Sequence, residues 1–586
     1  MEIRGIRLHR HPAIDLSALV GALVAAFLFL RLAGARAEHL AIPPARVDFN
    51  ADSAFLTTRI ISETFGNRVT GSEGARYAAT YLAAHFRTLG LSTSVQQFSI
   101  VVKDQLQQGR NVVAQSPGTV PGTIVLVAHY DGQPTSEQSA GDDASGVATM
   151  LELARVIERR GHRHPIVYLA TDAGEWGLVG AQSWAASLAD PRSVLAAISL
   201  DHVENGIGKT VRINGEGQDD DDYAPVWLRD AVGDAYAAGG VRTENAGTLD
   251  ELIHRVLGIT HTDQGALVDG EIPAVNLDVV SKRPAYAAFL YHTPGDRWET
   301  LKPQSFTLLG QGVERLVQAL DATAAPGPRG PLHYLGLGNG RMVRGFWILL
   351  AAIALFVPLG FAVWEAWQAA LADPASRSAI RSELVRAAGW WLIGIAGLLA
   401  LWAAVAVHLL PQYQASPATV RDPLLYQTRW VPILTTLAVM VLVGLLVTSL
   451  RKRPGLVVSH PLAGRAATLA TLAVVVVLTL IHNPFAAVWL LVLPAWLWPW
   501  IGPTRRPLTS AAGVVIVAAS AVPLVVAIVV MSRPLDVGSG VLWYLFLQAA
   551  YATWSPLTTV TLVVMLLAAF RLLGTATARL LPAEGD

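Results

Sequence analysis

Residues 123–132 read TIVLVAHYDG. The apolar run at the start of this stretch predicts a buried strand of a sheet that is covered on both faces. The run ends in His129 and Asp131, which are two residues apart and therefore point to the same side of an extended chain. Short apolar runs at 166–170 and 196–200 are likewise followed by polar residues. Because ligands of α/β sheets bind beyond the carboxyl ends of the strands, we expect the chemistry of the protein there.

Helical patterns alternate with these strands. Apolar residues at helical spacing predict helices over 72–89, 145–160 and 178–188, and a further short strand is predicted over 111–114. The alternation predicts an α/β domain with a mixed, mostly parallel sheet sandwiched by helices.

Side chains that bind metals follow the predicted strands. The chain has no cysteine, so any metal must be held by histidine, aspartate and glutamate. Clustered carboxylates without interleaved lysine or arginine repel one another unless a cation lies among them, and histidine with carboxylate suits zinc-type ions. The candidates are His129, Asp131, Asp142, Asp143, Asp172, Glu175, Asp201, His202, His261, Asp263, His292 and Asp296.

Composition separates a second part of the chain from this domain. Of the 586 residues 52% are apolar and only 15% are charged, with a mean hydropathy of +0.42, which excludes a purely soluble or disordered protein. The 44 basic and 44 acidic residues cancel, so no nucleic-acid partner is expected. Apolar runs long enough to cross a bilayer need about 20 residues. The runs lie at 16–30, 345–364, 389–410, 431–450, 466–481, 485–501, 510–531 and 541–573.

The number of spans depends on the last run, which is either one span after an interfacial aromatic stretch or two short spans. With a single crossing the protein has eight spans, counting the N-terminal run at 16–30. Its second half is then an all-α polytopic membrane domain in contact with lipid. The arginine-rich loops then all lie in the cytoplasm by the positive-inside rule, and residues 35–343 lie on the other side. These loops hold Arg377, Arg381 and Arg386, then Arg451, Lys452, Arg453 and Arg465, then Arg505 and Arg506.

The predicted domain boundaries follow from these patterns. Residues 1–37 form a membrane anchor or a signal segment, since Ala35-Arg36-Ala37 resembles a cleavage site. The exported α/β domain covers 38–330 and a linker covers 331–343. The multi-span domain covers 344–575 and the tail 576–586, and anchoring or scaffolding is the role expected of the membrane half because its spans hold few ionisable residues.

The ordered motifs resemble the co-catalytic di-zinc aminopeptidases and carboxypeptidases of peptidase clan MH. The matching stretches are His129-Tyr130-Asp131, Asp142-Asp143-Ala144-Ser145-Gly146, Gly174-Glu175-Trp176-Gly177-Leu178-Val179-Gly180-Ala181, Asp201 and His292-Thr293-Pro294-Gly295-Asp296. The combination of an N-terminal apolar segment, a peptidase domain and a multi-span half resembles the endoplasmic-reticulum metallopeptidase and vacuolar membrane protease branch.

The resemblance implies a zinc-peptidase-like fold and two zinc ions. It implies that His129, Asp142 and Asp201 hold one ion and that Asp142, Glu175 and His292 hold the other, with Asp142 as the bridge. Asp131 orients His129, a role that histidine ligands commonly require. The loop with His261 and Asp263 shapes the substrate pocket in this family, so these two residues are expected to bind substrate.

One position departs from the family pattern. The family has two glutamates in series, of which the first is the general base and the second a ligand. Alignment through Trp176-Gly177-Leu178 makes Glu175 the ligand and places Gly174 where the base belongs. General-base assistance is typically worth about 10² to 10⁴ in rate. Asp172 is the first candidate for a surrogate base, and Glu137, Asp143 and His202 are further candidates.

Two functions remain open at this point. The first is a membrane-anchored zinc metallopeptidase of the aminopeptidase type that hydrolyses peptides outside the cytoplasm, weakened by Gly174. The alternative is a catalytically inactive metal-binding or scaffold protein of the membrane. Restoring a glutamate at position 174 is expected to raise hydrolysis if the first reading is correct.

Overall fold

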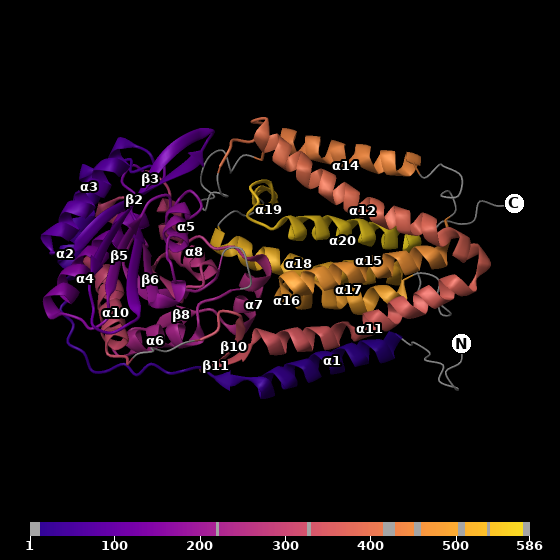
Figure 1. The fold of residues 1–586 in the computed structure, drawn as a ribbon, viewed down its shortest axis with the longest axis horizontal. Helices are drawn as coiled ribbons and strands as arrows, with labels where there is room; N and C mark the ends of the chain where they lie inside the picture. Colours follow the sequence, from indigo (N-terminus) through magenta and orange to yellow (C-terminus); the bar gives the residue numbers. More distant parts are fainter. Residues whose placement is uncertain are drawn as a thin grey trace.

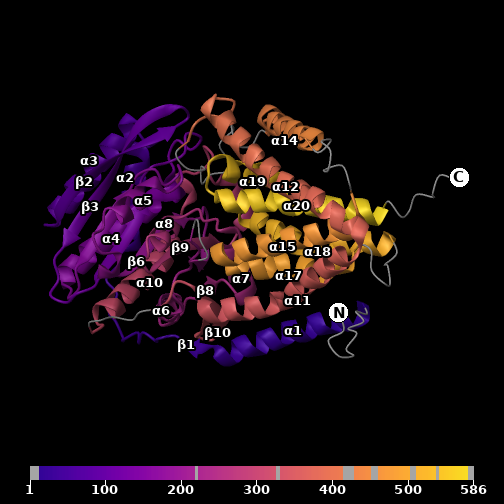
Figure 2. The same ribbon diagram turned by 45° about the vertical axis from the view of Figure 1, so that its right-hand side comes forward.

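The computed structural model describes residues 12–217, 222–324, 330–413, 428–450, 459–501, 510–535 and 540–577. An α/β domain lies at one end of the molecule, and a bundle of long helices lies at the other (Figure 1). The same division is visible after a turn of the view (Figure 2).

The α/β domain is built on an eight-stranded sheet with the order β2-β3-β5-β4-β6-β9-β7-β8. Its centre, β5-β4-β6-β9, is parallel, whereas β2, β3 and β7 pair in antiparallel fashion. The predicted mixed sheet is therefore confirmed. The strands are β2 (Ser92–Val102), β3 (Gln105–Ser116), β4 (Thr123–His129), β5 (Ile166–Thr171), β6 (Val194–Val203), β7 (Gly208–Asn214), β8 (Thr243–Asn245) and β9 (Ala274–Ser281).

Both faces of the central strands are buried, as the continuous apolar runs predict. Along β4, Ile124 and Leu126 enter one core cluster, while Val125 and Val127 enter another on the opposite face. The first face is covered by α2 (Ala51–Thr64), α3 (Glu73–Thr88), α4 (Ser145–Arg160), α6 (Val226–Ala237) and α10 (Pro303–Asp321), and the second by α5 (Val179–Ala186) and α8 (Asp263–Asp269).

The start of α4 is fixed against β6 by a close backbone approach. A Cβ atom added at Gly146 would lie 1.9 Å from the carbonyl oxygen of Leu200, so no larger residue fits there without a shift. The hydroxyl of Ser145 donates to the carbonyl of Gly141 and accepts from the backbone N–H of Val203. The Ser-Gly pair of the motif thus holds the loop before α4 against the end of β6.

The membrane half contains most of the helices that are long and apolar enough to span a bilayer. Seven helices of the described residues meet this criterion, α1 in the N-terminal segment among them. They are α1 (Pro12–Ala33), α11 (Gly345–Ala372), α12 (Pro374–Ala406), α14 (Trp430–Leu450), α15 (Pro461–His482), α18 (Ser510–Leu535) and α20 (Pro556–Thr577). The last apolar run divides into α19 (Val541–Ala550), a short aromatic helix, and the spanning-length α20.

The apolar run at 485–501, which was expected to span the membrane, forms a shorter helical segment than the seven helices named above. It forms the broken helical segment Pro484–Trp500, which contains α16 (Pro484–Ala486) and α17 (Val492–Leu497). Its first end reaches the α/β domain, where Asn483 donates to the carbonyl of Arg255. At its other end the carbonyl of Pro499 accepts from Arg465, near the start of α15. The segment therefore runs back along the whole of α15, from one end of the bundle to the other.

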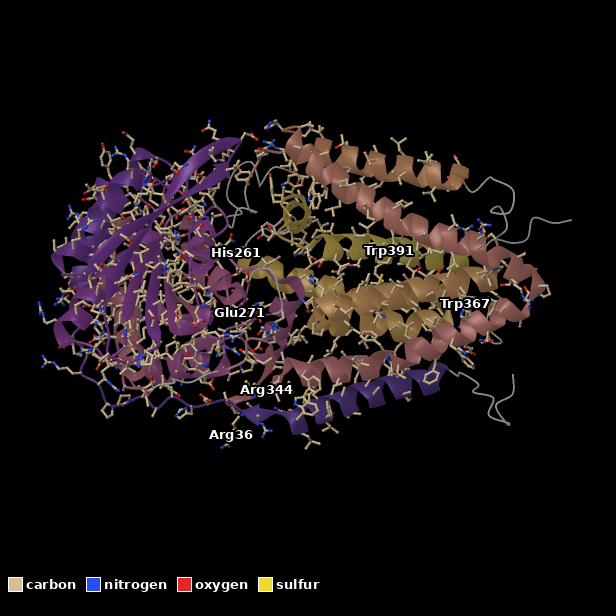
Figure 3. All side chains as sticks on the ribbon, viewed as in Figure 1. Arg36, His261, Glu271, Arg344, Trp367 and Trp391 are labelled. Atoms are coloured by element: carbon tan, nitrogen blue, oxygen red, sulfur yellow. The ribbon has the colours of Figure 1, made fainter. Side chains whose placement is uncertain are left out.

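The two halves of the molecule are joined by ordered structure. The segment expected to be a linker forms β10 (Tyr334–Gly338) and β11 (Arg341–Arg344), which build a small sheet with β1 (Ala35–Arg36) at the end of α1. Figure 3 shows Arg36 and Arg344 at this boundary. A second contact is made by α7 (Thr248–Leu257), which packs against α16 and α18.

Candidate metal centre

The carboxyl ends of the central strands bring together the groups that the motifs predict. His129 ends β4, Asp201 lies near the end of β6, and Glu175 lies in the loop after β5. Asp142 lies in the loop before α4, and His292 follows α9 (Pro284–Leu290). The side chains of all five are buried. Residues from five separate segments of the chain thus converge on one site.

Asp142 lies between the two histidines. Its Oδ1 lies 3.0 Å from His129 Nε2, and its Oδ2 lies 2.6 Å from His292 Nε2. Each oxygen therefore faces a different histidine, which is the arrangement that a carboxylate bridging two ions requires.

Two trios of candidate ligands surround this carboxylate. The ligand atoms of Asp142, Glu175 and His292 lie within 4.8 Å of one another, and so do those of His129, Asp143 and Asp201. The first trio is the set that the motifs imply for one ion. In the second trio, Asp143 joins the expected His129 and Asp201, while Asp142 stays in contact with His129. The sequence predicted Asp143 only as a base candidate and not as a member of a ligand trio.

Asp131 connects His129 to the loop that carries Glu175. Its Oδ1 lies 3.3 Å from His129 Nδ1 and accepts from the backbone N–H of Gly174, while its Oδ2 accepts from the backbone N–H of Glu175. Asp131 is completely buried. One carboxylate thus holds the orientation of a histidine from one trio and the backbone of a ligand from the other.

The electrostatics of the site are those of a cation-binding centre. Burial raises the pKa of Asp143 and of Glu175 well above the ordinary value, and neighbouring carboxylates act in the same direction. Burial disfavours the charged form of His129, but contacts with Asp131, Asp142 and Asp201 outweigh it and raise the pKa of that imidazole. These groups therefore favour their protonated forms unless a cation compensates the carboxylates.

Two buried carboxylate oxygens indicate independently that these residues fit zinc. Glu175 Oε1 and Asp143 Oδ2 are buried oxygens without a hydrogen-bond partner, one in each trio. Such oxygens are costly unless a cation or a donor satisfies them. Histidine nitrogen and carboxylate oxygen at this number and spacing are the ligands that zinc takes when cysteine is absent.

Gly174 packs directly against His129. A Cβ atom at this position would lie 2.7 Å from His129 Cγ and 2.8 Å from its Cβ. A glutamate at position 174 would therefore displace His129 or the loop, so the expectation that this substitution simply restores a base does not fit the backbone.

Asp172 is held away from the metal trios by its hydrogen bonds. Oδ1 accepts from the hydroxyl of Thr70 and the backbone N–H of Ala173, and Oδ2 accepts from the backbone N–H of Arg110 and the hydroxyl of Tyr130. Burial raises its pKa to about 7. A role as surrogate base would require Asp172 to give up part of this network.

Asp263 bonds to the end of β5, and His261 lies at the boundary with the membrane half. Asp263 Oδ2 accepts from the hydroxyl of Thr171, the residue that pairs with His129 across β4 and β5, while its buried Oδ1 has no hydrogen-bond partner. Burial raises the pKa of Asp263 to about 7. The ring of His261 lies 6.2 Å from that of Tyr544 in α19, at the boundary between the halves (Figure 3).

Two residues that support the ligands, Gln133 and Tyr291, were not singled out by the sequence reasoning. Gln133 donates to Glu175 Oε2 at 2.6 Å, and Tyr291 stacks on His292 with ring centroids 3.6 Å apart. Asp296, which the last motif contains, accepts from the backbone N–H groups of Gly141 and Asp142. The spacing of a single sequence gives no signal for Gln133, because its contact with Glu175 depends on the packing of two separate loops, whereas Tyr291 directly precedes the predicted ligand His292.

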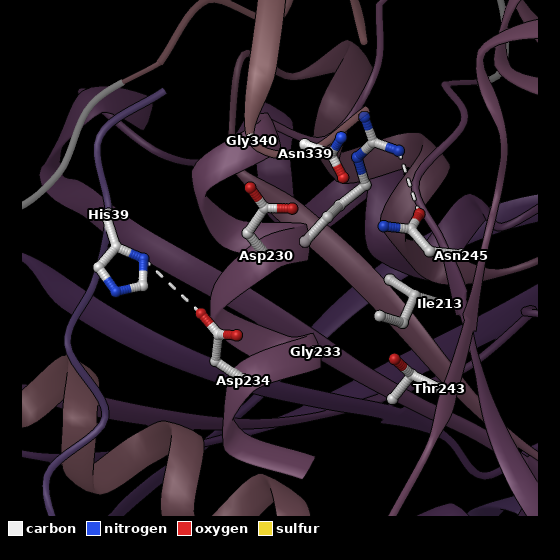
Figure 4. Close-up of a pocket in the computed structure, with 10 residues that line it drawn as sticks. His39, Ile213, Asp230, Gly233, Asp234, Thr243, Asn245, Asn339 and Gly340 are labelled. Atoms are coloured by element: carbon white, nitrogen blue, oxygen red, sulfur yellow. Dashed lines mark hydrogen bonds and ion pairs between the residues drawn. The ribbon is translucent and has the colours of Figure 1, made fainter. Parts of the chain in front are cut away.

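A cavity of about 380 Å³ lies elsewhere in the α/β domain (Figure 4). Its wall includes Arg229 and Asp234 of α6 and Thr243 of β8, and His39 lies 3.6 Å from Asp234 across it. The guanidinium of Arg229 is bound by Glu251 and by the hydroxyl of Tyr334. The cavity shares no residue with the metal trios and is not their entrance.

Comparison with known proteins finds a family match within the α/β domain. Residues 111–317 match Peptidase family M28, which confirms the resemblance to the zinc peptidases of clan MH. The chain is 26% identical over 176 residues to the alkaline phosphatase isozyme conversion protein of Escherichia coli (strain K12), covering 26% of this chain and 51% of that protein. It is 28% identical over 143 residues to leupeptin-inactivating enzyme 1 of Streptomyces exfoliatus, covering 24% of this chain and 31% of that enzyme.

Among solved structures the chain is similar to BSAP, a zinc aminopeptidase from Bacillus subtilis. The likeness has a TM-score of 0.40 and 16% sequence identity, and it covers 47% of this chain and 95% of that one. The chain spans about half of the length of the first curated relative and about a third of the second.

Proposed function

We propose that the protein is a membrane-anchored zinc metallopeptidase of the aminopeptidase type that hydrolyses peptides outside the cytoplasm. The observation that carries the proposal is the position of Asp142, whose two oxygens face His129 and His292 in two trios of buried ligands. The match of residues 111–317 to Peptidase family M28 supports the same conclusion.

Two zinc ions are proposed as the cofactors. His129 and Asp201 would hold one together with Asp142 or Asp143, and Asp142, Glu175 and His292 would hold the other. Zinc in such a site polarises a carbonyl group and lowers the pKa of water toward about 7. Asp131 fixes the imidazole of His129, and Gln133 fixes the carboxylate of Glu175.

The position of the usual general base provides no proton acceptor, because Gly174 has no side chain. Asp172 is retained as a proposed acceptor, although four hydrogen bonds hold it. Asp263 is proposed as the alternative acceptor, since its buried Oδ1 has no hydrogen-bond partner, whereas both oxygens of Asp172 accept hydrogen bonds. His261 and Asp263 are also proposed to bind the peptide. We expect turnover that is about 10² to 10⁴ lower than with a dedicated base.

Placement of the peptidase domain outside the cytoplasm rests on the arginines. The start of α12 and the end of α20 lie at the end of the bundle remote from the α/β domain (Figure 1). Arg377 and Arg386 lie near the start of α12 and Arg571 near the end of α20, and Arg386 and Arg571 contact Glu383. The basic residues at 451–453 and 505–506 lie outside the described residues. By the positive-inside rule the remote end faces the cytoplasm, and the eight apolar segments, including Pro484–Trp500, each cross the bilayer once.

The experiment that tests the function is hydrolysis of a panel of peptides and aminoacyl anilides by the zinc-loaded full chain. The controls are the chelated chain and Glu175→Ala, and both are expected to abolish turnover. Asp263→Asn and Asp172→Asn assign the proton acceptor, since the one that serves this role is expected to lower kcat and leave KM nearly unchanged.

A second function is favoured by Gly174 alone. In this alternative the protein binds zinc but serves as a membrane scaffold without peptidase activity. Full zinc loading without turnover of any peptide in the panel would favour the scaffold.

A further inference from the structure

The loop that carries Glu175 contains residues in unfavourable backbone conformations. Ala173 has a φ of +62° and Leu178 a φ of +62°, both in the left-handed region that favours glycine. Residues in such conformations persist only where the surrounding structure holds them. The loop over 173–178 therefore depends on its neighbours, and so does the position of Glu175.

One side of this loop is held from within the α/β domain. Asp131 accepts hydrogen bonds from the backbone N–H groups of Gly174 and Glu175. These two bonds fix the backbone of the loop beside His129. They leave the side chain of Trp176, the next residue, to be packed by other parts of the chain.

The other side of the loop is held by the membrane half. The indole of Trp176 is 2% exposed and stacks on the ring of Tyr413, with ring centroids 5.8 Å apart and an angle of 18° between the planes. Ala173 and Val179 enter the same apolar cluster as Leu547 of α19. The neighbours of the ligand loop on this side thus include residues from beyond residue 400, together with Ile100 and Val102 of β2 and Lys103, whose Nζ lies 5.3 Å from the centroid of the Trp176 ring.

Tyr413 is held by two contacts of its own and by two contacts of the residues just before it. It pairs with Val102 as an isolated antiparallel bridge, so the turn between β2 and β3 is bound to the membrane half. Its ring meets that of Tyr551 edge to face at 5.4 Å, and the hydroxyl of Tyr551 donates to the carbonyl of Pro411. Next to it, the backbone N–H of Gln412 donates to Asp104 at the same turn.

We propose that Tyr413 is a positioning residue for the metal ligand Glu175, acting through Trp176, and that the metal centre is complete only when the membrane half is packed against the α/β domain. The proposal rests on the proposed metal centre and assigns the membrane half a role beyond anchoring. Loss of a supporting contact behind a metal ligand typically weakens metal binding about 10–100-fold. The trio with Glu175 is the one affected, because the contact reaches that ligand.

The test uses the full chain in detergent with Tyr413→Ala, Tyr413→Phe and the control Trp496→Ala. Trp496 lies in α17, where its indole donates to the carbonyl of Leu355, so its loss removes a ring of the membrane half from another site. Amide hydrogen exchange of residues 173–179 is measured in the metal-free chain, and zinc affinity is measured by competition with a chelator. The absorption spectrum of the cobalt-loaded chain reports the geometry around the ligands.

We expect Tyr413→Ala to raise exchange in 173–179, to weaken one zinc site about 10–100-fold and to change the cobalt spectrum. Tyr413→Phe keeps the ring and is expected to retain the wild-type exchange, zinc affinity and cobalt spectrum. Trp496→Ala is also expected to leave these three properties unchanged. Wild-type exchange and zinc affinity in Tyr413→Ala would overturn the proposal, as would the same losses in Trp496→Ala. A wild-type chain that binds zinc but hydrolyses no peptide would overturn the proposed function alone, because exchange and zinc binding still decide the role of Tyr413.

Discussion

At the scale of single residues, the metal centre depends on carboxylates that each serve two partners. Asp142 faces two histidines, and Asp131 contacts one of these histidines together with the backbone of the Glu175 loop. Motif spacing predicted these residues because histidine and carboxylate at successive strand ends have few other uses. The same spacing did not predict that Asp143 would enter a trio, since that depends on the loop conformation before α4.

Substitution of Asp131 tests this double role. In Asp131→Asn one carboxylate oxygen becomes an amide nitrogen that faces a backbone N–H group, and His129 loses a charged partner. We expect zinc affinity to fall about 10–100-fold while the chain stays folded, as measured by chelator competition and thermal melting. A matched change at another buried carboxylate, Asp278→Asn, is expected to leave zinc affinity unchanged; equal losses in both variants would contradict the role of Asp131.

Asp278 also gives a prediction for pH dependence. Burial raises its pKa from 3.8 to about 7. The unfolded chain releases this proton near pH 4 and the folded chain only near pH 7, so the stabilising contribution is lost as the pH rises through this interval. At about 1.36 kcal/mol per unit this amounts to a few kcal/mol. The asparagine of Asp278→Asn does not titrate. We therefore expect the melting temperature of the metal-free variant to fall less between about pH 5 and pH 8 than that of the metal-free wild type.

At the scale of elements, the sequence predicted the strands and helices that surround the site because both faces of the central strands are buried. The helices predicted over 72–89 and 145–160 correspond closely to α3 and α4. The strand expected at 111–114 is part of the longer β3, which pairs with β2 over residues 105–115 and with β5 only over residues 112–116. Half-exposed edge strands carry a weaker apolar pattern, which is why the long hairpin was not predicted.

The contact between α4 and β6 can be tested with two glycines. Gly146→Ala would place a methyl group 1.9 Å from the carbonyl oxygen of Leu200, so we expect a loss of stability of about 1–3 kcal/mol or more and weaker zinc binding. Gly233→Ala in α6 is the control, because its added Cβ would meet the nearest atom at 3.7 Å and alanine favours helices. Thermal melting of both full-length variants checks the prediction, which an unchanged Gly146→Ala would refute.

At the scale of the whole molecule, apolar runs predicted the membrane half and the structure locates it against the metal-ligand loop. Run length alone did not predict that contact, since it depends on how distant loops fold together. The runs also gave helix ends only approximately: α12 begins at Pro374 rather than near 389, and it carries the buried Glu383, which contacts Arg386 and Arg571. This ion cluster at the remote end of the bundle was not predicted.

The absence of native cysteine makes the topology directly testable. Ser94 lies exposed on β2 and Ser378 lies exposed near the start of α12. A membrane-impermeant maleimide is expected to label Ser94→Cys in intact cells and to label Ser378→Cys only after the membrane is opened. The reverse pattern would contradict the proposed orientation, and the unmodified chain is a background without thiols.

The proposed zinc hydrolase is decided by the rate of peptide hydrolysis as zinc is titrated into the metal-free full chain, with Glu175→Ala titrated beside it. If the paired trios around Asp142 form a working site, turnover rises with zinc, reaches its limit when both trios are filled and stays at background in Glu175→Ala. A chain that takes up zinc to saturation without any rise in hydrolysis would contradict the proposal.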